Sequence, residues 1–291
     1  MTQTSDSPRR FDLGACRVTL LDGGRFKLDG GAMFGIIPKA LWSRSVPADQ
    51  ENRIVLACNC LLVEWPGRTD RRVIIETGHG AKYGQKECGF FDIDPQRWLL
   101  TGLRAAGVAP ETISDVIVTH LHFDHAGGLT RADGDRIVPA FPNARVHVQR
   151  REYDDAQANF GTMKTTYRQE NLRPLDEARA WRLLDGEAEC VPGICALPTP
   201  GHTRGHQSVL IRGRDRCAVF PGDLLPTAAH VGAPYNMAYD LFPLENRQSK
   251  QTLLRRAADE HWLIFIDHEP RVPVVTATVE KDWFTLRPAL D

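Results

Sequence analysis

The stretch THLHFDHAGG, residues 119–128, constrains this chain more than any other part of its sequence. It places three histidines and one aspartate within six consecutive positions, where the apolar run DVIVTH ends. Side chains alternate along a strand, so His120 and His122 can point the same way where that strand ends. Asp124 and His125 follow where the chain must turn, and the glycine pair behind them allows a sharp turn.

Nitrogen and oxygen donors of these kinds suit borderline metals such as zinc. Clustering four such groups with nothing to bind would cost desolvation free energy, so the stretch predicts a metal site. Four groups on one turn cannot complete two coordination shells, and further ligands must therefore come from elsewhere. Three candidates follow later apolar runs at turns, namely His202 in ALPTPGHTRGH, Asp223 in AVFPGDLLP and His268 in LIFIDHEP. This repeated order of strand, turn and ligand is what a site at one sheet edge requires.

Apolar, β-branched runs recur along the chain, bounded by Gly, Pro, Asp or Asn, as strands are. The predicted strands cover residues 16–22, 53–65, 72–78, 115–120, 144–149, 194–199, 207–212, 217–222, 262–267 and 272–279. A helix is predicted from Asp94-Pro95 to Gly107, and another from Leu244 to Glu260. The polar segment 150–180 is predicted to be a helical excursion from the sheet. Interleaved strands and helices imply α/β layers. Periodicity alone does not distinguish a doubly wound sheet from a sandwich covered by helices.

No linker, repeat or low-complexity block divides residues 1–291, and we expect a single domain in which residues 1–10 are flexible. The 36 basic and 37 acidic side chains nearly cancel, which disfavours a general electrostatic grip on nucleic acid or a membrane surface. No apolar segment is long enough to span a bilayer, and the polar first residues do not resemble a signal peptide. The seven cysteines show no CxxC pair, so reduced thiols in a cytoplasm are expected. Cys58 and Cys60 are expected to pack in the core.

The motifs HLHFDH, TPGHTRGH, GD and DHE together resemble the metallo-β-lactamase superfamily, in family order and over nearly the whole chain. The resemblance implies an αββα sandwich of two mixed sheets, with a dinuclear metal site at one edge. It implies that one metal is held by His120, His122 and His202, the other by Asp124, His125 and His268, and that Asp223 bridges the two. Ligand type favours two zinc ions, although manganese, iron or cobalt could occupy the same donors.

The ligand set also narrows the branch of the superfamily. An aspartate in the bridging position and no cysteine among the ligands disfavour a class B β-lactamase. Flavodiiron proteins carry a glutamate where this chain has His122, which disfavours an oxygen-reducing iron site. A tRNA-processing nuclease would need a basic substrate-binding arm, and the sequence has no Lys/Arg cluster to supply one. The stretches LDGGAMFGIIPKALW and GDLLPTAAHVGAPYNMAYDLFP resemble the quorum-quenching N-acyl-homoserine-lactone lactonases and their organophosphate-hydrolase relatives. In that group Met33 and Phe34 would offer an apolar wall for an acyl chain, unless they merely pack in the core.

The chain also departs from that pattern. Some lactonases place a substrate-holding tyrosine three residues beyond the bridging aspartate, where this chain has Pro226. Three side chains on the same segment could replace it, namely His230, Tyr235 and Tyr239. Glu76 stands where the superfamily usually has aspartate, so its hydrogen bond to a ligand histidine is in question. Asp240 and Asp267 are candidates for orienting ligand histidines.

The predicted reaction is the opening of lactones or esters by water activated between two metals, with Asp124 carrying a proton to the leaving oxygen. The alternatives are hydrolysis of other esters, phosphotriesters or thioesters on the same site, a nuclease or phosphodiesterase, and a metal-binding scaffold without turnover. The expected partner is a small-molecule substrate. The resemblance also implies a homodimer, with segment 150–180 as the candidate contact.

Overall fold

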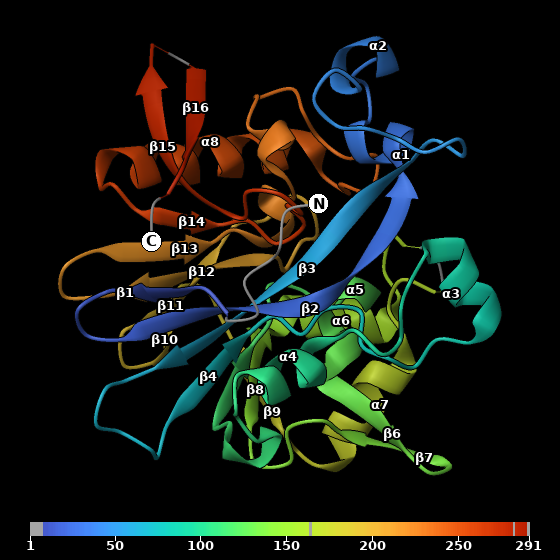
Figure 1. Cartoon of the computed structure of the whole chain (residues 1–291), viewed down its shortest axis with the longest axis vertical. Coiled ribbons are helices and arrows are strands. Elements are labelled where there is room, and N and C mark those ends of the chain that lie inside the picture. The colour runs from blue at the N-terminus through green and yellow to red at the C-terminus, as the bar shows by residue number, and fades with distance from the viewer. Residues whose placement is uncertain (1–7, 163–164, 282, 290–291) are drawn as a thin grey trace.

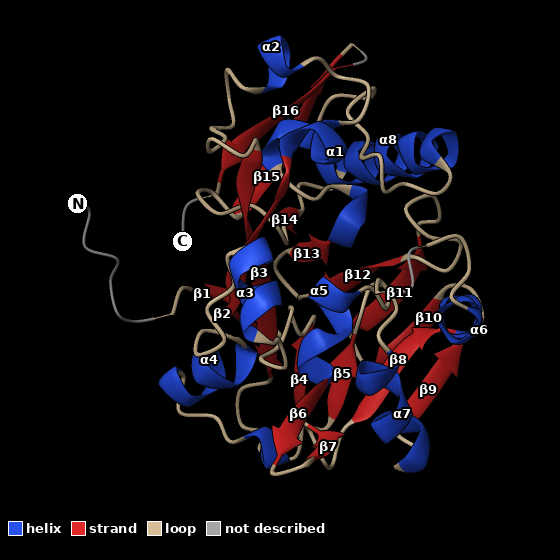
Figure 2. Ribbon diagram, turned by 90° about the vertical axis from the view of Figure 1, so that its right-hand side faces the viewer, coloured by secondary structure: helices blue, strands red, loops and turns tan. Residues whose placement is uncertain are grey.

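The computed structural model describes residues 8–162, 165–281 and 283–289. Two seven-stranded sheets form its centre (Figures 1 and 2). In spatial order, the first sheet contains β1 (Arg10–Asp12), β2 (Arg17–Asp29), β3 (Arg53–Glu64), β4 (Arg72–Ile75), β5 (Asp115–Ile117), β8 (Arg145–Gln149) and β9 (Trp181–Leu184). The second contains β10 (Ala188–Val191), β11 (Ile194–Pro198), β12 (Gln207–Arg212), β13 (Cys217–Phe220), β14 (Leu263–Phe265), β15 (Val274–Glu280) and β16 (Trp283–Pro288).

Both sheets are mixed. The strands β4, β5, β8 and β9 run parallel to one another, and so do β13 and β14, whereas the other pairs within the two sheets are antiparallel. A separate hairpin pairs β6 (Thr130–Asp133) with β7 (Arg136–Pro139). The helices are α1 (Gly30–Phe34), α2 (Lys39–Trp42), α3 (Gln85–Phe91), α4 (Leu99–Ala105), α5 (Phe123–Ala126), α6 (Arg150–Ala158), α7 (Gln169–Glu177) and α8 (Pro243–Asp259).

The main core lies between the sheets. Val63, Ile75 and Ile117 of the first sheet share one buried cluster with Phe220 and Phe265 of the second. The outer face of the first sheet is covered by α4 and α7, and that of the second by α8. In Figure 1, α8 accordingly lies beside β14 and β15 in the upper half of the view, and α4 and α7 lie in the lower half. The layers therefore run helix, sheet, sheet, helix, and the αββα sandwich is confirmed.

All ten strands predicted from the sequence are present in the described structure, and Cys58 and Cys60 are buried as expected. The sequence did not predict β1, β9, β10, β16 or the β6–β7 hairpin. These strands are short or largely exposed, so they lack the continuous apolar signal of the central strands.

The helix predicted from Asp94 begins instead at Leu99. Asp94 Oδ1 accepts a hydrogen bond from the backbone N–H of Gln96 (2.9 Å), which makes a turn rather than a helix cap. Trp98, with an extended backbone, is the true N-cap residue, and the helix ends before Gly107 at φ +72°. The second predicted helix is confirmed as α8, displaced by one residue at each end.

Segment 150–180 contains α6 and α7, so its helical character is confirmed for the residues described. It does not stand apart from the sandwich, because Glu152 and Asp155 of α6 are buried. The predicted flexible start, 1–10, falls mostly on residues 1–7, which lie outside the described residues, and Arg10 already belongs to β1.

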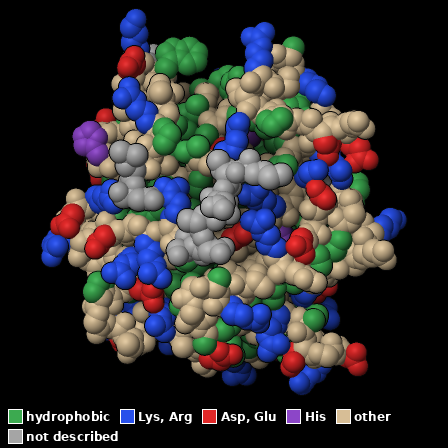
Figure 3. Space-filling view, viewed as in Figure 1, with side chains coloured by type: hydrophobic (Ala, Val, Ile, Leu, Met, Phe, Trp, Pro, Cys, Tyr) green, Lys and Arg blue, Asp and Glu red, His purple; other side chains and the backbone are tan. Residues whose placement is uncertain are grey.

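No helix in the described parts of the chain is long and apolar enough to cross a membrane. On the face shown in Figure 3, basic and acidic side chains are interspersed. This agrees with the near balance of charge in the sequence.

Candidate metal centre and cavity

Strand ends position the residues predicted to bind metal. His120 and His122 follow β5, with His122 at the start of α5, and His202, Asp223 and His268 follow β11, β13 and β14. The structure brings the seven predicted residues together in one buried cluster. Its members are His120, His122, Asp124, His125, His202, Asp223 and His268.

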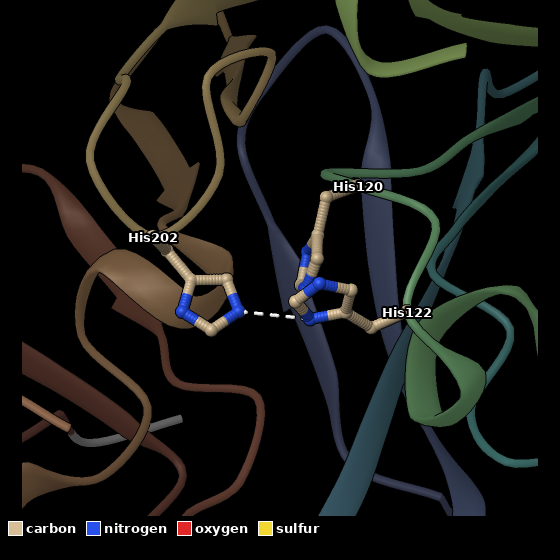
Figure 4. A group of neighbouring side chains, drawn as sticks. All are labelled: His120, His122 and His202. Carbon is tan, nitrogen blue, oxygen red and sulfur yellow. Dashed lines mark hydrogen bonds between the residues drawn. The ribbon is translucent and has the colours of Figure 1, made fainter. Parts of the chain in front are cut away.

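Three histidines form the first group. His122 Nδ1 and His202 Nε2 lie 3.0 Å apart (Figure 4). The His120 ring lies 4.5 Å from the His122 ring and 4.7 Å from the His202 ring, between centroids. One nitrogen of each ring can therefore reach a common point, which is the arrangement needed to hold one cation.

Asp124, His125 and His268 form the second group. His268 Nε2 lies 3.3 Å from His125 Nε2 and 3.6 Å from Asp124 Oδ2. Asp223 stands between the groups, with Oδ2 3.1 Å from His202 Nε2 and Oδ1 3.1 Å from His268 Nε2. Its two oxygens thus face different groups, as expected of a carboxylate that bridges two cations.

The metal-facing atoms of the cluster would be better satisfied by cations than by hydrogen bonds to one another. His202 Nδ1 is bonded to Asp240 and His268 Nδ1 to the Ala57 carbonyl, so in each neutral ring Nε2 presents a lone pair to the cluster. His120 Nε2 is buried without a hydrogen-bond partner among the described residues, and its contact with Asp223 Oδ2 is 3.8 Å long. Buried polar atoms seldom lack a partner. Divalent cations would satisfy both the converging lone pairs and this orphaned nitrogen.

Burial and charged neighbours shift the pKa values of the cluster residues. Burial and the neighbouring histidines lower the pKa values of His120 and His122 well below the usual range, so both rings stay neutral. Burial opposes the charge on His268, but Asp267 and Asp223 outweigh it and raise the pKa of His268 to about 9. Burial likewise opposes the charge on Asp223, yet His202, His125 and His268 hold its pKa well below the usual range. The carboxylates thus favour positive charge at His268, and a cation bound at its Nε2 would supply that charge in place of the proton.

Carboxylates behind the cluster orient its histidines. Asp240 Oδ1 accepts from His202 Nδ1 at 2.9 Å, and Asp267 Oδ2 lies 3.2 Å from His125 Nδ1. Glu76 Oε2 is more distant, at 3.5 Å from the same nitrogen, and Glu76 Oε1 accepts from the Thr119 backbone N–H at 2.6 Å. The glutamate thus fixes the backbone before the motif more firmly than it fixes the histidine.

The glycine pair after the motif serves a different purpose from the predicted one. Neither Gly127 nor Gly128 has a positive φ angle. A Cβ on Gly127 would lie 2.1 Å from the His79 carbonyl oxygen, and one on Gly128 would lie 2.2 Å from that of Thr77. These glycines are needed because two backbones approach closely, not because the chain turns sharply.

A cavity of about 840 Å³ opens onto the cluster. Five of the seven cluster residues form its floor, namely His122, Asp124, His202, Asp223 and His268. Its wall is mainly apolar and includes Met33, Phe91, Phe123, Met237 and Leu241. Charged side chains also line it, among them Lys27, Arg53, Glu87 and Arg168. A small molecule with one polar end and an apolar tail matches this distribution.

Of the residues predicted to contact substrate, some line the cavity and others are packed behind its wall. Met33 and Tyr239 line the cavity. Phe34 lies behind its wall, stacked on the rings of Trp42 (5.1 Å) and His230 (4.6 Å). His230 is also fully buried and does not line the cavity, and Tyr235 packs edge-on against Phe34.

Sequence reasoning missed Glu152, a buried carboxylate on α6 that contacts the backbone of the histidine motif. It lies in a polar stretch, and nothing in its spacing distinguishes it from the exposed acidic residues around it. His206 is also buried beside the cluster, where it bonds Thr199 through Nδ1.

A model of the Metallo-beta-lactamase superfamily matches residues 53–268. An N-acyl homoserine lactonase from Bacillus cereus is 40% identical over 114 residues, which are 39% of this chain and 38% of that protein. The match therefore spans less than half the length of that relative. A probable metal-dependent hydrolase from Staphylococcus aureus is 30% identical over 97% of this chain and 100% of its own, with a TM-score of 0.85.

AidC, a dizinc quorum-quenching lactonase, has been solved in complex with a product, N-hexanoyl-L-homoserine. It covers 98% of this chain and 98% of its own at a TM-score of 0.79, with 18% identity. At that identity the likeness establishes a common fold.

Proposed function

This chain belongs to the metallo-beta-lactamase superfamily of metal-dependent hydrolases, and we propose that it opens the lactone ring of N-acyl-homoserine lactones. The observation that carries this proposal is the cavity, whose floor is the His/Asp cluster and whose wall is mainly apolar. An acyl-homoserine lactone has a polar ring that would lie at the cluster and an apolar chain that would lie along the wall. The partial identity with a Bacillus lactonase supports the same substrate class.

We assign the two groups of the cluster to two divalent cations, with zinc favoured by the donor types and manganese, iron or cobalt able to use the same donors. The assigned ligands are His120, His122 and His202 for one cation, Asp124, His125 and His268 for the other, and Asp223 for both. When bound, such cations polarise the scissile carbonyl and lower the pKa of the attacking water toward neutrality.

Asp124 is the residue proposed to move the proton. It lies on the cavity floor, and its carboxylate is close to both His125 and His268. In this role a carboxylate oxygen of Asp124 accepts the proton of the attacking water and donates it to the ring oxygen as the C–O bond breaks.

Tyr239 is proposed to replace the tyrosine that is missing at Pro226. Its side chain lines the cavity, and burial, with smaller contributions from Asp29 and Asp124, raises its pKa to about 12. The phenol therefore remains protonated at physiological pH and can donate a hydrogen bond to the substrate carbonyl oxygen. Tyr235 does not line the cavity, so the proposal rests on Tyr239, with Met33 in the wall for the acyl chain.

The test is ring opening of a short-chain and a long-chain acyl-homoserine lactone, followed by pH-stat with protein of known metal content. We expect opening of at least one lactone, loss of activity on chelation and recovery with zinc. His122→Ala and Asp223→Ala should lose metal and activity together. A protein that holds two metals but opens neither lactone would overturn the proposal, and phosphotriesters and other esters would then be tested on the same sample.

A further inference from the structure

Glu152 is a charged side chain buried under the first group of histidines, with a relative exposure of 0%. A carboxylate in such a place destabilises the fold unless its oxygens accept hydrogen bonds. Three donors satisfy it: Oε1 accepts from the Leu121 backbone N–H and the Tyr167 hydroxyl, each at 3.0 Å, and Oε2 accepts from the Thr203 hydroxyl at 2.5 Å.

The donors are distinguished by where they lie in the chain. Leu121 stands between His120 and His122, in the loop that follows a strand of the first sheet. Thr203 directly follows His202, in the loop after a strand of the second sheet. One carboxylate therefore ties together the two loops that carry the three histidines. Tyr167 adds a contact, because its ring lies 5.0 Å from the His122 ring.

The helix that carries this carboxylate is itself fixed against the His202 loop. Asp155, one turn further along α6, accepts from Arg204 Nε at 2.8 Å, and Arg204 is the second residue after His202. A Cβ on Gly205 would lie 2.2 Å from the Glu152 backbone nitrogen, so the loop and the helix are in close contact. Glu152 is thus held in place from outside the cluster.

We infer that Glu152 is a positioning residue that sets the spacing of His120, His122 and His202, and hence the metal affinity of that group. Among the described residues, Glu152 makes no hydrogen bond to the second group, Asp124, His125 and His268. In that group Asp267 orients His125, and the Ala57 carbonyl orients His268. Loss of its three hydrogen bonds therefore weakens one metal site selectively. The inference rests on the proposed function only in taking the cluster to bind two divalent cations.

Substitutions at two positions separate geometry from charge. Glu152→Ala removes all three acceptor contacts. In Glu152→Gln the amide oxygen can accept from Leu121 and Tyr167, and the amide N–H can donate to the Thr203 oxygen, so the geometry is kept without the charge. Thr203→Val removes only the hydrogen bond between Glu152 and the loop that carries His202. The matched control is Tyr153→Phe on the same helix, because the Tyr153 hydroxyl donates to Asp176 (2.8 Å) and not to the cluster.

The measurement is a Co²⁺ titration of the metal-free full-length protein, followed by visible absorption and by competition with a chelator. His202→Ala and His268→Ala supply reference spectra for loss of the first and second groups. We expect Glu152→Ala to weaken one of two sites by about 10- to 100-fold, the usual effect of removing an outer partner of metal ligands. Its spectrum at one equivalent should match that of His202→Ala. Glu152→Gln and Tyr153→Phe should stay within about threefold of the parent protein.

Folded Glu152→Ala that binds both equivalents as the parent does would overturn the inference. If Glu152→Ala does not fold, Thr203→Val decides, and parental affinity at both sites would overturn it. Glu152→Gln as weak as the alanine variant would show that charge acts rather than position, which also overturns it. Failure of the proposed function is a separate result, since parent protein can bind two cobalt ions normally and open no lactone.

Discussion

Two carboxylates that do not line the cavity, Asp240 and Asp267, contact histidines of opposite groups. Asp240 is fixed by three donors, because it accepts from His202 Nδ1 (2.9 Å), the Met237 backbone N–H (3.0 Å) and Asn236 Nδ2 (3.0 Å). Asp267 Oδ2 lies beside His125 Nδ1. Each carboxylate sets the orientation of one ring and increases its basicity as a ligand.

Asp240→Ala and Asp267→Ala should therefore impair metal binding in different ways. Each variant is expected to lose about 10- to 100-fold in affinity at one site and much less at the other. Competition titrations with chelators of graded strength would measure both affinities. The corresponding asparagine variants are the controls, since an amide oxygen can still accept from the histidine. Equal loss at both sites in each variant would contradict separate orientation of the two groups.

The predicted metal ligands could be found from the sequence because their signal is local. His120, His122, Asp124 and His125 form one dense motif, and each later candidate directly follows an apolar strand. Glu152 gave no such signal, because its burial depends on how α6 packs against loops distant in the chain. The roles of the charged residues in the cavity, such as Arg168, likewise depend on tertiary contacts.

At the scale of elements, α8 fixes the loop that precedes it, residues 225–242, which forms one cavity wall. Lys250 of α8 is 2% exposed and donates to three backbone carbonyls, those of His230 (2.9 Å), Gly232 (3.2 Å) and Tyr235 (2.7 Å). His230 in turn bonds the Met33 carbonyl through Nε2 at 2.8 Å. A single buried ammonium thus holds the loop that carries Met237 and Tyr239 and connects it with α1.

Lys250→Met should destabilise the protein by about 1–3 kcal/mol at pH 7, because three buried carbonyls lose their donor. Burial lowers the pKa of Lys250 from 10.5 to about 8. The unfolded chain then binds more protons than the native one between these values, so the unfolding free energy of the parent protein rises with pH there. The variant lacks this gain, and by pH 9.5 the parent should have gained about 2 kcal/mol relative to it. Urea unfolding at pH 7 and 9.5 measures the difference, and a constant gap would contradict the shifted pKa.

Helix α3 covers the cavity without burying any residue of its own. Polar contacts hold it instead: Arg53 donates to the Phe90 carbonyl (3.0 Å), Lys27 pairs with Asp92 (2.9 Å) beyond its end, and Arg168 pairs with Glu87 (2.5 Å). Arg168 also lies over the Tyr83 ring, 4.6 Å from its centroid. Charged contacts therefore help to position this cover, together with the packing of Phe91 on Phe123 (5.3 Å between ring centroids).

Glu87→Gln should loosen the cover and raise KM for the preferred substrate by about two- to fivefold, with kcat little changed. This corresponds to about 0.4–1 kcal/mol, the upper part of the range for exposed ion pairs. Salt screens such pairs, so KM of the parent protein should rise with ionic strength more than that of the variant. Steady-state kinetics at low and high salt would test this, with Asp70→Asn as the control, because its ion pair with Arg68 lies outside the cavity lining. An identical salt response in parent protein and Glu87→Gln would count against a charge-held cover.

Secondary structure was predictable where several residues carry one pattern. The central strands and α8 show apolar runs or a helical stripe, and all were recovered. Their ends were less accurate, because β2 continues to Asp29, beyond its predicted end at residue 22, and β5 ends at Ile117 rather than at residue 120. The predicted start of α4 was wrong because an Asp-Pro pair occurs in turns as well as at helix starts. Only the surrounding structure decides between the two, and here Asp94 makes a turn.

At the scale of the whole molecule, the site spans the junction of the two sheets. His120 and His122 follow β5 of the first sheet, whereas His202, Asp223 and His268 follow strands of the second. Periodicity could not choose between a doubly wound sheet and a sandwich, since both need buried strands. The resemblance of the motifs to the metallo-β-lactamase superfamily made the choice, because that family has two facing sheets.

Cations bound at this junction would cross-link the sheets, so their removal should destabilise the whole fold. A ligand present at 1,000 times its Kd adds about 4 kcal/mol to the unfolding free energy for each site. For a chain of this size we expect chelation to lower Tm by roughly 10 °C or more. Thermal unfolding with and without chelator, then after adding zinc back, measures the effect. His202→Ala, lacking one ligand, should respond less to chelation than the parent protein. An unchanged Tm after verified metal removal would mean that the sheets hold together without the cations, and that the cluster is preformed by packing alone.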